Sequence, residues 1–201
     1  MIKGFDISEQ NVPPDCDHIP DSVFQAAVDA GCKFVYVRAS WGNGHEDKEF
    51  RYNVDKAHEY GLLVGAYHYD YGLHPSDAAR QAQKCRAIIE DAGVLLELPV
   101  FYDLEDADGW KRSNGFDFSR ENCTAMCKAW LENIGLNSGV YASYSWLCNL
   151  IDWKSLECPV WNAQWDDNDD LGGYVWQNTN EMWLGTHAFD GDYMYDESVF
   201  A

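Results

Sequence analysis

Four glycines divide the first two thirds of the chain into repeating units of helix-like and strand-like sequence. Gly31, Gly61, Gly93 and Gly135 each follow a segment whose apolar residues recur with helical spacing, and each precedes an apolar run. Glycine is favoured just past a helix because it adopts the left-handed conformation without strain. The repeat therefore predicts an α/β chain with parallel strands, covered by helices and joined by right-handed crossovers.

The expected strands are the five apolar runs at 2–8, 33–40, 62–71, 98–105 and 138–144. Asp21, Ser76 and Ser119 are the expected N-caps of helices that end near Gly31, Gly93 and Gly135, and a short helix is expected at 146–150. The alternation of helix-like and strand-like segments stops beyond Cys158, where further strands are expected at 159–165, 174–178 and 187–195. The gaps between these last strands are too short for a crossover helix, which predicts antiparallel or hairpin connections.

Eight strands with helices only in the first part predict a barrel that begins like a TIM barrel and ends as plain β-sheet. A chain of 201 residues with 46% hydrophobic content is suited to one domain. We therefore expect residues 1–201 to form a single barrel without a separate second domain. The active site of such a barrel lies at the C-terminal ends of its parallel strands.

Two carboxylates end the fourth apolar run, as Asp103-Leu104-Glu105. If this run is a strand, both side chains share one face and lie about 6–7 Å apart along the chain. Repulsion between the two carboxylates raises the pKa of one of them and leaves a protonated acid beside a carboxylate. Glycosidases use such a pair to cleave a glycosidic bond. A solvated acidic loop is the alternative, since Asp106 and Asp108 follow at once.

Other acidic and aromatic residues are predicted at the same end of the barrel. Asp6 ends the first strand, and Asp190 on the last strand lies beside it if the barrel closes. Carboxylates that face a barrel interior are costly to bury, which favours a functional role. Aromatic rings stack on sugar faces, and we expect Tyr67 and Tyr141 to contact substrate. Trp161 and Trp176 are the candidate tryptophans for the same role.

Composition argues against several other functions. The formal net charge of −20 disfavours nucleic acid and anionic membranes as partners, because both are bound through Lys and Arg. No cysteine pair has zinc-ligand spacing, so most of the seven cysteines are expected to be buried small side chains. The acidic run at 166–170 lacks the glycine of a calcium loop, because Leu171 stands at that position. We expect no metal and no cofactor, and a core position for His68.

The chain resembles the family 25 glycoside hydrolases, the muramidases of phage endolysins and of bacterial or fungal lysozymes. Eight motifs carry the resemblance in the same order along nearly the whole chain. They are Gly4–Ser8, Phe34–Ala39, Gly65–Tyr69, Asp103–Glu105, Gly139–Tyr141, Trp161–Trp165, Trp176-Gln177 and Phe189-Asp190. The sequence departs from the family pattern at Asn11-Val12 and at Asn178, away from the carboxylates.

The resemblance implies a (β/α)5β3 barrel that hydrolyses the β-1,4 bond between N-acetylmuramic acid and N-acetylglucosamine in peptidoglycan. It implies that Glu105 is the general acid, and that Asp103 stabilises the cationic transition state or orients the 2-acetamido group. Asp6 and Asp190 correspond to acidic residues that support binding and tune Glu105. Tyr67 and Tyr141 correspond to pocket aromatics.

Two alternatives stay open: a chitinase-like hydrolase of N-acetylglucosamine polymers, and an inactive sugar-binding barrel. The expected partner is the glycan strand of peptidoglycan, with a monomer as the default state. No charged and apolar leader precedes the first strand, so we expect no signal peptide. That pattern fits synthesis in the cytoplasm and action on the wall after release, as for phage endolysins, or a trimmed secreted domain.

Overall fold

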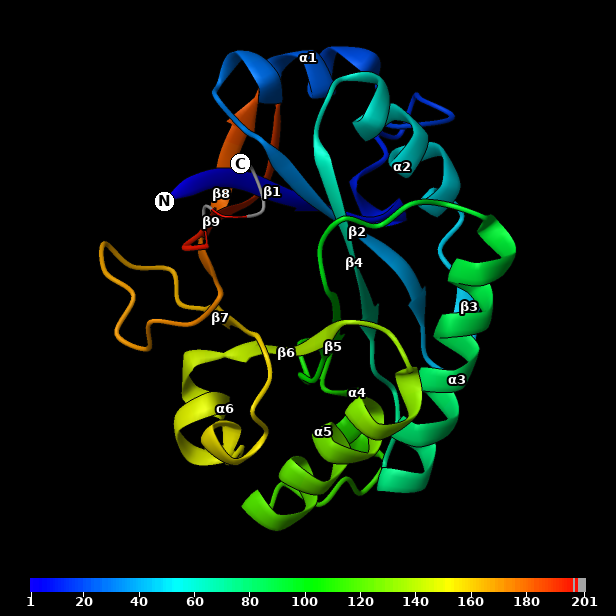
Figure 1. The fold of residues 1–201 in the computed structure, drawn as a ribbon, viewed down its shortest axis with the longest axis vertical. Coiled ribbons are helices and arrows are strands. Elements are labelled where there is room, and N and C mark those ends of the chain that lie inside the picture. Colours follow the sequence, from blue (N-terminus) through cyan, green and yellow to red (C-terminus); the bar gives the residue numbers. More distant parts are fainter. Residues whose placement is uncertain (197, 199–201) are drawn as a thin grey trace.

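The strands close into a barrel because the first strand pairs with both the second and the last (Figure 1). This computed structural model describes residues 1–196 and 198. β1 (Ile2–Ile7) runs parallel to β2 (Phe34–Trp41) and antiparallel to β9 (His187–Met194). Between them the order is β9-β8-β7-β6-β5-β4-β2, and β3 (His45–Glu46) forms a short hairpin with β2. The predicted barrel is confirmed.

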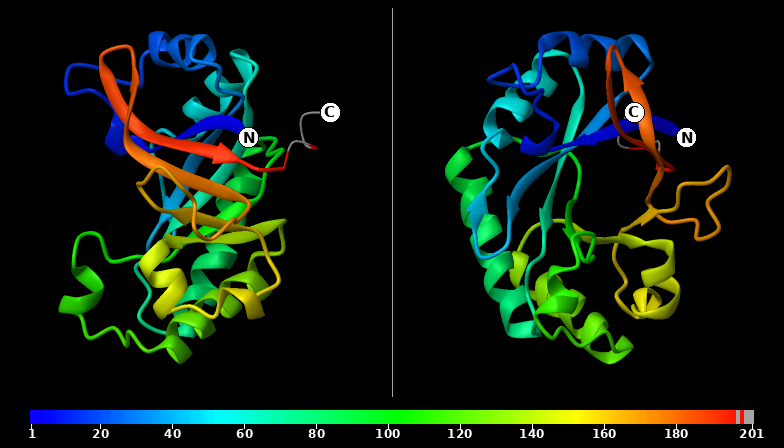
Figure 2. Two further views of the ribbon diagram at one scale, coloured as in Figure 1. Left: turned by 90° about the vertical axis from the view of Figure 1, so that its left-hand side faces the viewer. Right: turned by 180° about the vertical axis from the view of Figure 1, so that it is seen from behind.

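The other strands are β4 (Leu63–Tyr69), β5 (Val100–Asp103), β6 (Ser138–Ser143), β7 (Val160–Ala163) and β8 (Val175–Leu184). The helices are α1 (Asp21–Asp29), α2 (Phe50–Glu59), α3 (Pro75–Ala92), α4 (Trp110–Ser113), α5 (Arg120–Ile134) and α6 (Tyr144–Asn149). Short 3-10 turns lie at η1 (Glu9–Asn11) and η2 (Trp153–Ser155). Helices α2, α3 and α5 lie along the side of the barrel formed by β2, β4 and β5 (Figures 1 and 2).

The helix ends follow the sequence signals, with two shifts at the N-termini. Gly93 and Gly135 close α3 and α5 in the left-handed conformation, with φ of 65° and 67°. Ser119 caps α5 as predicted, accepting a hydrogen bond from the Asn122 backbone. α3 begins before Ser76 because Pro75 suits the first helical position, which leaves His74 as its cap. Asp21 is likewise inside the first turn of α1 rather than its cap.

The connection between β7 and β8 differs from the expectation of antiparallel strands. These strands are parallel, with Trp161 opposite Val175. The loop at 164–174 makes the return crossing without a helix, bulging away from the barrel at the left of Figure 1. β8 and β9 form the expected antiparallel hairpin, but β8 extends to Leu184 and leaves only Gly185-Thr186 as the turn. Figure 2 shows this long hairpin from the side.

Two hydrophobic layers are separated by the sheet. Large rings fill the barrel interior, including Phe101 and Trp161, while a wider cluster lies between strands and helices. Alternation along β5 turns Tyr102 outward, where its ring stacks on Trp130 of α5 at 4.8 Å. Gly65 makes room for the inner layer, since a Cβ there would lie 2.1 Å from the Tyr36 ring. This layer forms the floor beneath the C-terminal ends of the strands.

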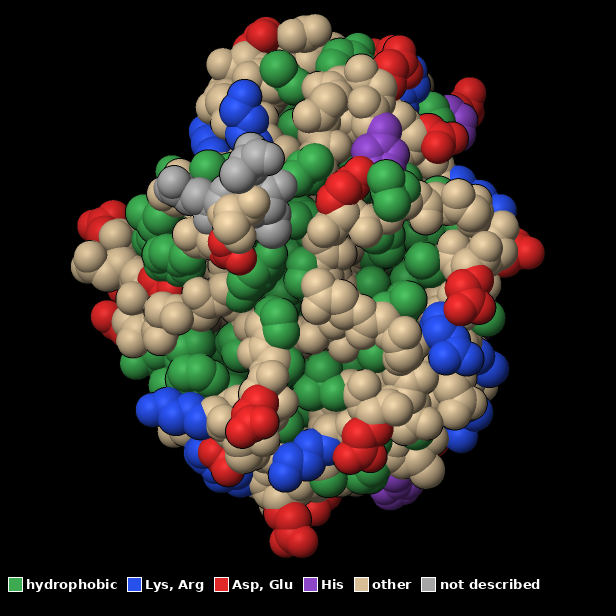
Figure 3. All heavy atoms as spheres, viewed as in Figure 1, with side chains coloured by type: hydrophobic (Ala, Val, Ile, Leu, Met, Phe, Trp, Pro, Cys, Tyr) green, Lys and Arg blue, Asp and Glu red, His purple; other side chains and the backbone are tan. Residues whose placement is uncertain are grey.

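Acidic and basic side chains lie mainly around the margin of the face seen in Figure 3, with hydrophobic side chains nearer its middle. Among residues 1–196 and 198, none of the helices combines the length and apolar character needed to cross a membrane. Cys32, Cys85, Cys123 and Cys127 are buried, as expected of small hydrophobic side chains. Cys16 and Cys148 are exposed, because both lie in surface segments outside the apolar faces.

Candidate active site

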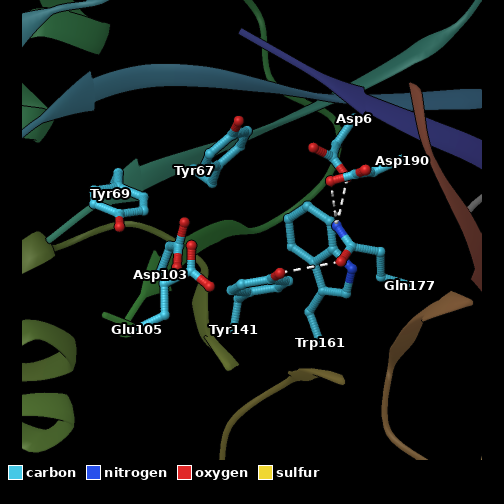
Figure 4. Close-up of a pocket in the computed structure, with 9 residues that line it drawn as sticks. All are labelled: Asp6, Tyr67, Tyr69, Asp103, Glu105, Tyr141, Trp161, Gln177 and Asp190. Atoms are coloured by element: carbon cyan, nitrogen blue, oxygen red, sulfur yellow. Dashed lines mark hydrogen bonds between the residues drawn. The ribbon is translucent and has the colours of Figure 1, made fainter. Parts of the chain in front are cut away.

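A pocket of about 190 Å³ opens at the C-terminal ends of the parallel strands (Figure 4). Its lining contains every site residue predicted from the sequence except Trp176, and adds Tyr69 and Gln177. The lining residues are Asp6, Tyr67, Tyr69, Asp103, Glu105, Tyr141, Trp161, Gln177 and Asp190. Residues far apart in sequence thus meet at one mouth because each lies in a barrel strand or just beyond one.

Asp103 and Glu105 lie together on one side of this pocket (Figure 4). Asp103 is the last residue of β5, and Glu105 lies just beyond the strand rather than in it. Leu104 between them is fully buried in the outer core, so the alternation continues past the end of the strand. The Leu104 backbone N–H donates to the Tyr141 carbonyl at 3.1 Å, which fixes this geometry.

Burial changes the acidity of both carboxyls. Burial, followed by repulsion from Glu105, raises the pKa of Asp103 well above its ordinary value. Burial raises the pKa of Glu105 to about 7, with Asp190 adding to the effect and Lys111 opposing it. The expectation that only one pKa of the pair is raised is therefore wrong, because both side chains are desolvated. The pKa of Glu105 thus lies close to neutrality.

Asp103 also presents an unused acceptor. Its side chain is 4% exposed, and Oδ1 has no hydrogen-bond partner within the described part of the chain. A buried acceptor without a donor costs about 1–3 kcal/mol. Such an atom in a pocket is suited to receive a proton or a donor from a bound molecule.

Gln177 organises the opposite side of the pocket. Its Nε2 donates to Asp6 Oδ2 at 2.8 Å and to Asp190 Oδ2 at 3.3 Å. Asp6 and Asp190 face each other across the β1–β9 pair, as the closed barrel predicts. Burial raises the pKa of Asp190 to about 6 and that of Asp6 well above its ordinary value. The two carboxyls thus share one amide donor.

Gln177 was missed as a site residue, although alternation along β8 could have identified it. Val175 lies in the barrel interior, so Gln177 faces inward and Trp176 faces outward. The Trp176 indole donates to the Gln164 carbonyl at 2.7 Å and lies beside the Tyr193 ring. Trp176 therefore lies outside the pocket, which corrects its predicted place there.

Trp161 lies in the floor of the pocket rather than at its rim. It is 2% exposed, and its indole N–H donates to Asp192 Oδ1 at 2.8 Å. The Tyr141 ring stands against it, edge to face, with centroids 4.8 Å apart. Trp161 thus supports the Tyr141 side chain that lines the pocket wall.

A second cavity of about 310 Å³ adjoins the first, with Tyr69 contributing to both. Its lining combines aromatic rings with polar groups, namely Glu9, Gln10, Arg38, Trp41, Tyr69 and Tyr71. Arg38 is held by ion pairs with Glu9 at 3.2 Å and Asp47 at 2.8 Å. Because the charge of Arg38 is already paired, this cavity suits a neutral polar ligand better than an anion.

His68 belongs to the core, as predicted. It is fully buried, with ring nitrogens 2.8 Å from Ser40 Oγ and 2.7 Å from Gln81 Oε1. Burial lowers its pKa to about 4, so the ring is neutral. No cluster of three or more His, Cys, Asp or Glu within residues 1–196 and 198 is arranged to hold a metal ion.

Comparison with known proteins gives a consistent match. The sequence model of the glycosyl hydrolases family 25 matches residues 6–187. The N,O-diacetylmuramidase of Arthroderma benhamiae is 25% identical, over 95% of this chain and 80% of that protein. Lysozyme M1 of Streptomyces globisporus is 23% identical, over 82% of this chain and 55% of that protein.

A similar fold occurs in the modular autolysin LytC of Streptococcus pneumoniae, solved in complex with a synthetic peptidoglycan ligand. Its TM-score is 0.83 at 22% identity, and the match covers 96% of this chain and 46% of the autolysin. At this identity the likeness shows the fold alone. The chain spans about half the length of the lysozyme and of the autolysin.

Proposed function

Because this chain belongs to the glycosyl hydrolases family 25, we propose that it is a lysozyme-type muramidase. The proposed reaction is hydrolysis of the β-1,4 bond between N-acetylmuramic acid and N-acetylglucosamine in peptidoglycan. The observation that carries the proposal is the pairing of buried Asp103 with half-buried Glu105 at the barrel mouth. The names of the muramidase and lysozyme relatives, and the ligand of the autolysin, support this substrate class.

Glu105 is the proposed general acid. A general acid must be protonated at the working pH and must lose its proton easily, so a pKa near neutrality suits it. Burial gives Glu105 a pKa of about 7. In the proposed step its proton passes to the glycosidic oxygen as the bond to the anomeric carbon breaks, and the departing sugar leaves as an alcohol.

Asp103 is the proposed partner at the anomeric centre. The unpartnered Oδ1 can accept the N–H of a 2-acetamido group, which would orient that group beneath the sugar ring. Once ionised, the same carboxylate stabilises positive charge that develops on the ring. Both roles require a second carboxylate close to the acid, which the side-by-side arrangement of Asp103 and Glu105 supports.

Asp6, Asp190, Tyr67 and Tyr141 are the proposed supporting residues. Asp6 and Asp190 are held by Gln177 and present polar atoms to the sugar. Tyr67 and Tyr141 line the pocket, and aromatic rings of this kind contact the apolar faces of sugars. Trp161 acts beneath them as the floor.

The second cavity extends the proposed binding groove. It is larger than the catalytic pocket, so it has room for a further sugar ring of the same strand. Tyr69 lies at the junction of the two cavities. We therefore propose the glycan strand of peptidoglycan as the partner, bound across several sugars, with the enzyme acting at the cell wall.

Clearing of Gram-positive cell walls, compared with cleavage of chitin oligomers, tests this proposal. A muramidase clears walls in preference to chitin oligomers, whereas a chitinase-like enzyme does the reverse. The Glu105→Gln variant, which keeps the shape of the side chain, should fold normally and lose nearly all clearing. Clearing that survives in this variant would show that another residue is the acid. A sugar-binding barrel without activity would neither clear walls nor cleave chitin oligomers, whether or not it carried Glu105→Gln.

A further inference from the structure

Lys111 is a buried cation six residues after Glu105 in the chain. It lies in α4, is 2% exposed, and its Nζ is 3.0 Å from Asp70 Oδ2. The same ammonium donates to the Asp70 backbone carbonyl. Rings of Tyr71 and Phe116 lie 5.9 and 5.8 Å from it. Burying an ion pair gives little net stability, so its presence here calls for another explanation.

Asp70, the ion-pair partner of Lys111, is hydrogen-bonded to the last residue of β5, the strand that ends in Asp103. Asp70 follows β4 directly, and its backbone N–H donates to the Asp103 carbonyl at 3.0 Å. Its carboxylate is itself fixed, because Oδ1 accepts the Gly72 N–H at 2.9 Å. Lys111 and Asp103 therefore both contact Asp70, Lys111 at its carboxylate and carbonyl and Asp103 at its backbone N–H.

The loop that carries Glu105 is folded around the backbone of Lys111. The Asp106 carboxylate accepts the Lys111 N–H at 2.7 Å and the Arg112 N–H at 3.3 Å. Two residues further on, Asp108 Oδ2 accepts the Tyr71 hydroxyl at 2.6 Å. Glu105 is thus enclosed between an anchor at Leu104 and anchors at Asp106 and Asp108.

We propose that Lys111 is a positioning residue for the reaction. Its ion pair with Asp70 holds the segment 104–111 against the end of β4, fixes Glu105 beside Asp103, and places a positive charge behind both carboxyls. This inference rests on the proposed function, since it assigns the device that aims the proposed acid.

The charge of Lys111 opposes the other influences on Glu105. Burial raises the pKa of Glu105 most, and Asp190, Asp108 and Asp106 raise it further, whereas Lys111 lowers it. Lys111 and Arg38 likewise lower the pKa of Asp103 against burial and Glu105. The hydroxyls of Tyr69, Tyr71 and Tyr141 are further titratable groups that interact with Glu105. Removing the cation should therefore raise the pKa of Glu105.

Three variants separate positioning from simple stabilisation. Lys111→Met leaves Asp70 as an unpaired buried charge and should lower the melting temperature. The double variant Asp70→Asn with Lys111→Met removes both charges, which restores stability in many proteins. Lys111→Arg keeps the charge. Lys128→Met, at an exposed lysine of α5, is the matched control.

The expected readouts are kinetic and spectroscopic. In both variants that lack the cation, kcat on peptidoglycan should fall by about 10- to 100-fold with little change in KM, as expected for a misplaced acid. The alkaline limb of the pH–rate profile should move to higher pH in these variants and keep its wild-type place in Lys111→Arg. NMR titration of the Glu105 carboxyl should show the same upward shift without any substrate.

Wild-type kcat and an unmoved Glu105 titration in the stable double variant would overturn the proposal, leaving Lys111 a merely structural residue. An Lys128→Met variant that shifts the profile equally would also overturn it, because the effect would then follow net charge. The NMR titration keeps this inference separate from the proposed function. A wild-type protein that cleaves no peptidoglycan contradicts the function, whereas the titration still reports on Lys111.

Discussion

The Tyr141 hydroxyl donates a hydrogen bond of 3.1 Å to Oε1 of Gln177, 36 residues further along the chain. The other end of the same amide donates to Asp6 on β1. One side chain therefore connects β6, β8 and β1 across the mouth of the barrel. Gln177, Asp6 and Tyr141 are all buried, so loss of the amide would leave polar groups of Asp6 and Tyr141 without this hydrogen bond.

Gln177→Ala should destabilise the fold by about 1–3 kcal/mol, because it leaves buried polar partners unsatisfied. It should also lower activity, since Asp6 and Tyr141 lose the group that orients them. Urea unfolding and a wall-clearing assay measure the two effects. Asn180→Ala, at an exposed position of β8, is the control and should change neither. Equal stability of the two variants would contradict the role given to Gln177.

Activity should fall as pH rises through about 7, because the pKa of Glu105 lies at about that value and only its protonated form can donate. The pH dependence of kcat/KM on soluble peptidoglycan fragments measures the pKa of this acid in the free enzyme. A profile that stays flat to pH 9 would show that another group donates the proton.

Asp192→Asn should stabilise the protein at pH 8, because it removes a carboxyl that folding buries away from water. Burial raises the pKa of Asp192 well above its ordinary value, with Trp161 opposing the shift and Asp190 adding to it. A carboxyl whose pKa is higher in the folded protein than in the unfolded chain stabilises the fold below its unfolded pKa. That stabilisation is lost as pH rises through its folded pKa. Asparagine keeps the acceptor for Trp161.

The gain from Asp192→Asn should therefore shrink as pH falls toward the ordinary aspartate pKa of about 3.9, below which the wild-type carboxyl is protonated in both states. Thermal unfolding of both proteins from pH 4 to pH 8 measures it. A gain that does not depend on pH would mean that packing, rather than charge, is responsible.

Trp41→Ala should weaken cleavage of long glycan strands more than cleavage of short fragments. Trp41 lines the second cavity, next to the Tyr71 ring at 6.2 Å. Loss of one ring contact is worth about 0.5–1.5 kcal/mol, or about 2- to 12-fold in kcat/KM. Rates on a series of oligosaccharides of increasing length check this. Trp183→Ala, at an indole that is 65% exposed on β8, should leave the length dependence unchanged.

The barrel could be predicted because its periodic signals are local. Glycines such as Gly93 and Gly135 mark helix ends, and alternation on β5 separates Phe101 and Asp103 from Tyr102. The parallel pairing of β7 and β8 could not be predicted in this way. Its crossing is made by an irregular loop whose own hydrogen bonds, such as Asn162 to Asp169 at 2.8 Å, carry no periodic signal.

The site was predictable where its residues lie at or next to the ends of strands, as Asp103 and Asp6 do. Gln177 and Lys111 escaped prediction because their roles depend on partners far away in sequence. Gln177 meets Asp6 across 171 residues, and Lys111 meets Asp70 across 41. The acidity of Asp103 was misjudged for a related reason, since burial is a property of the folded chain rather than of the motif.

The identity of the reducing-end sugar tests the central claim most directly. Peptidoglycan digested by the purified protein should give fragments that end in N-acetylmuramic acid, as read by mass spectrometry after borohydride reduction. The Glu105→Gln variant should give none of them. Fragments that end in N-acetylglucosamine, or equal yields from the variant, would contradict the account of this protein as a muramidase with Glu105 as its acid.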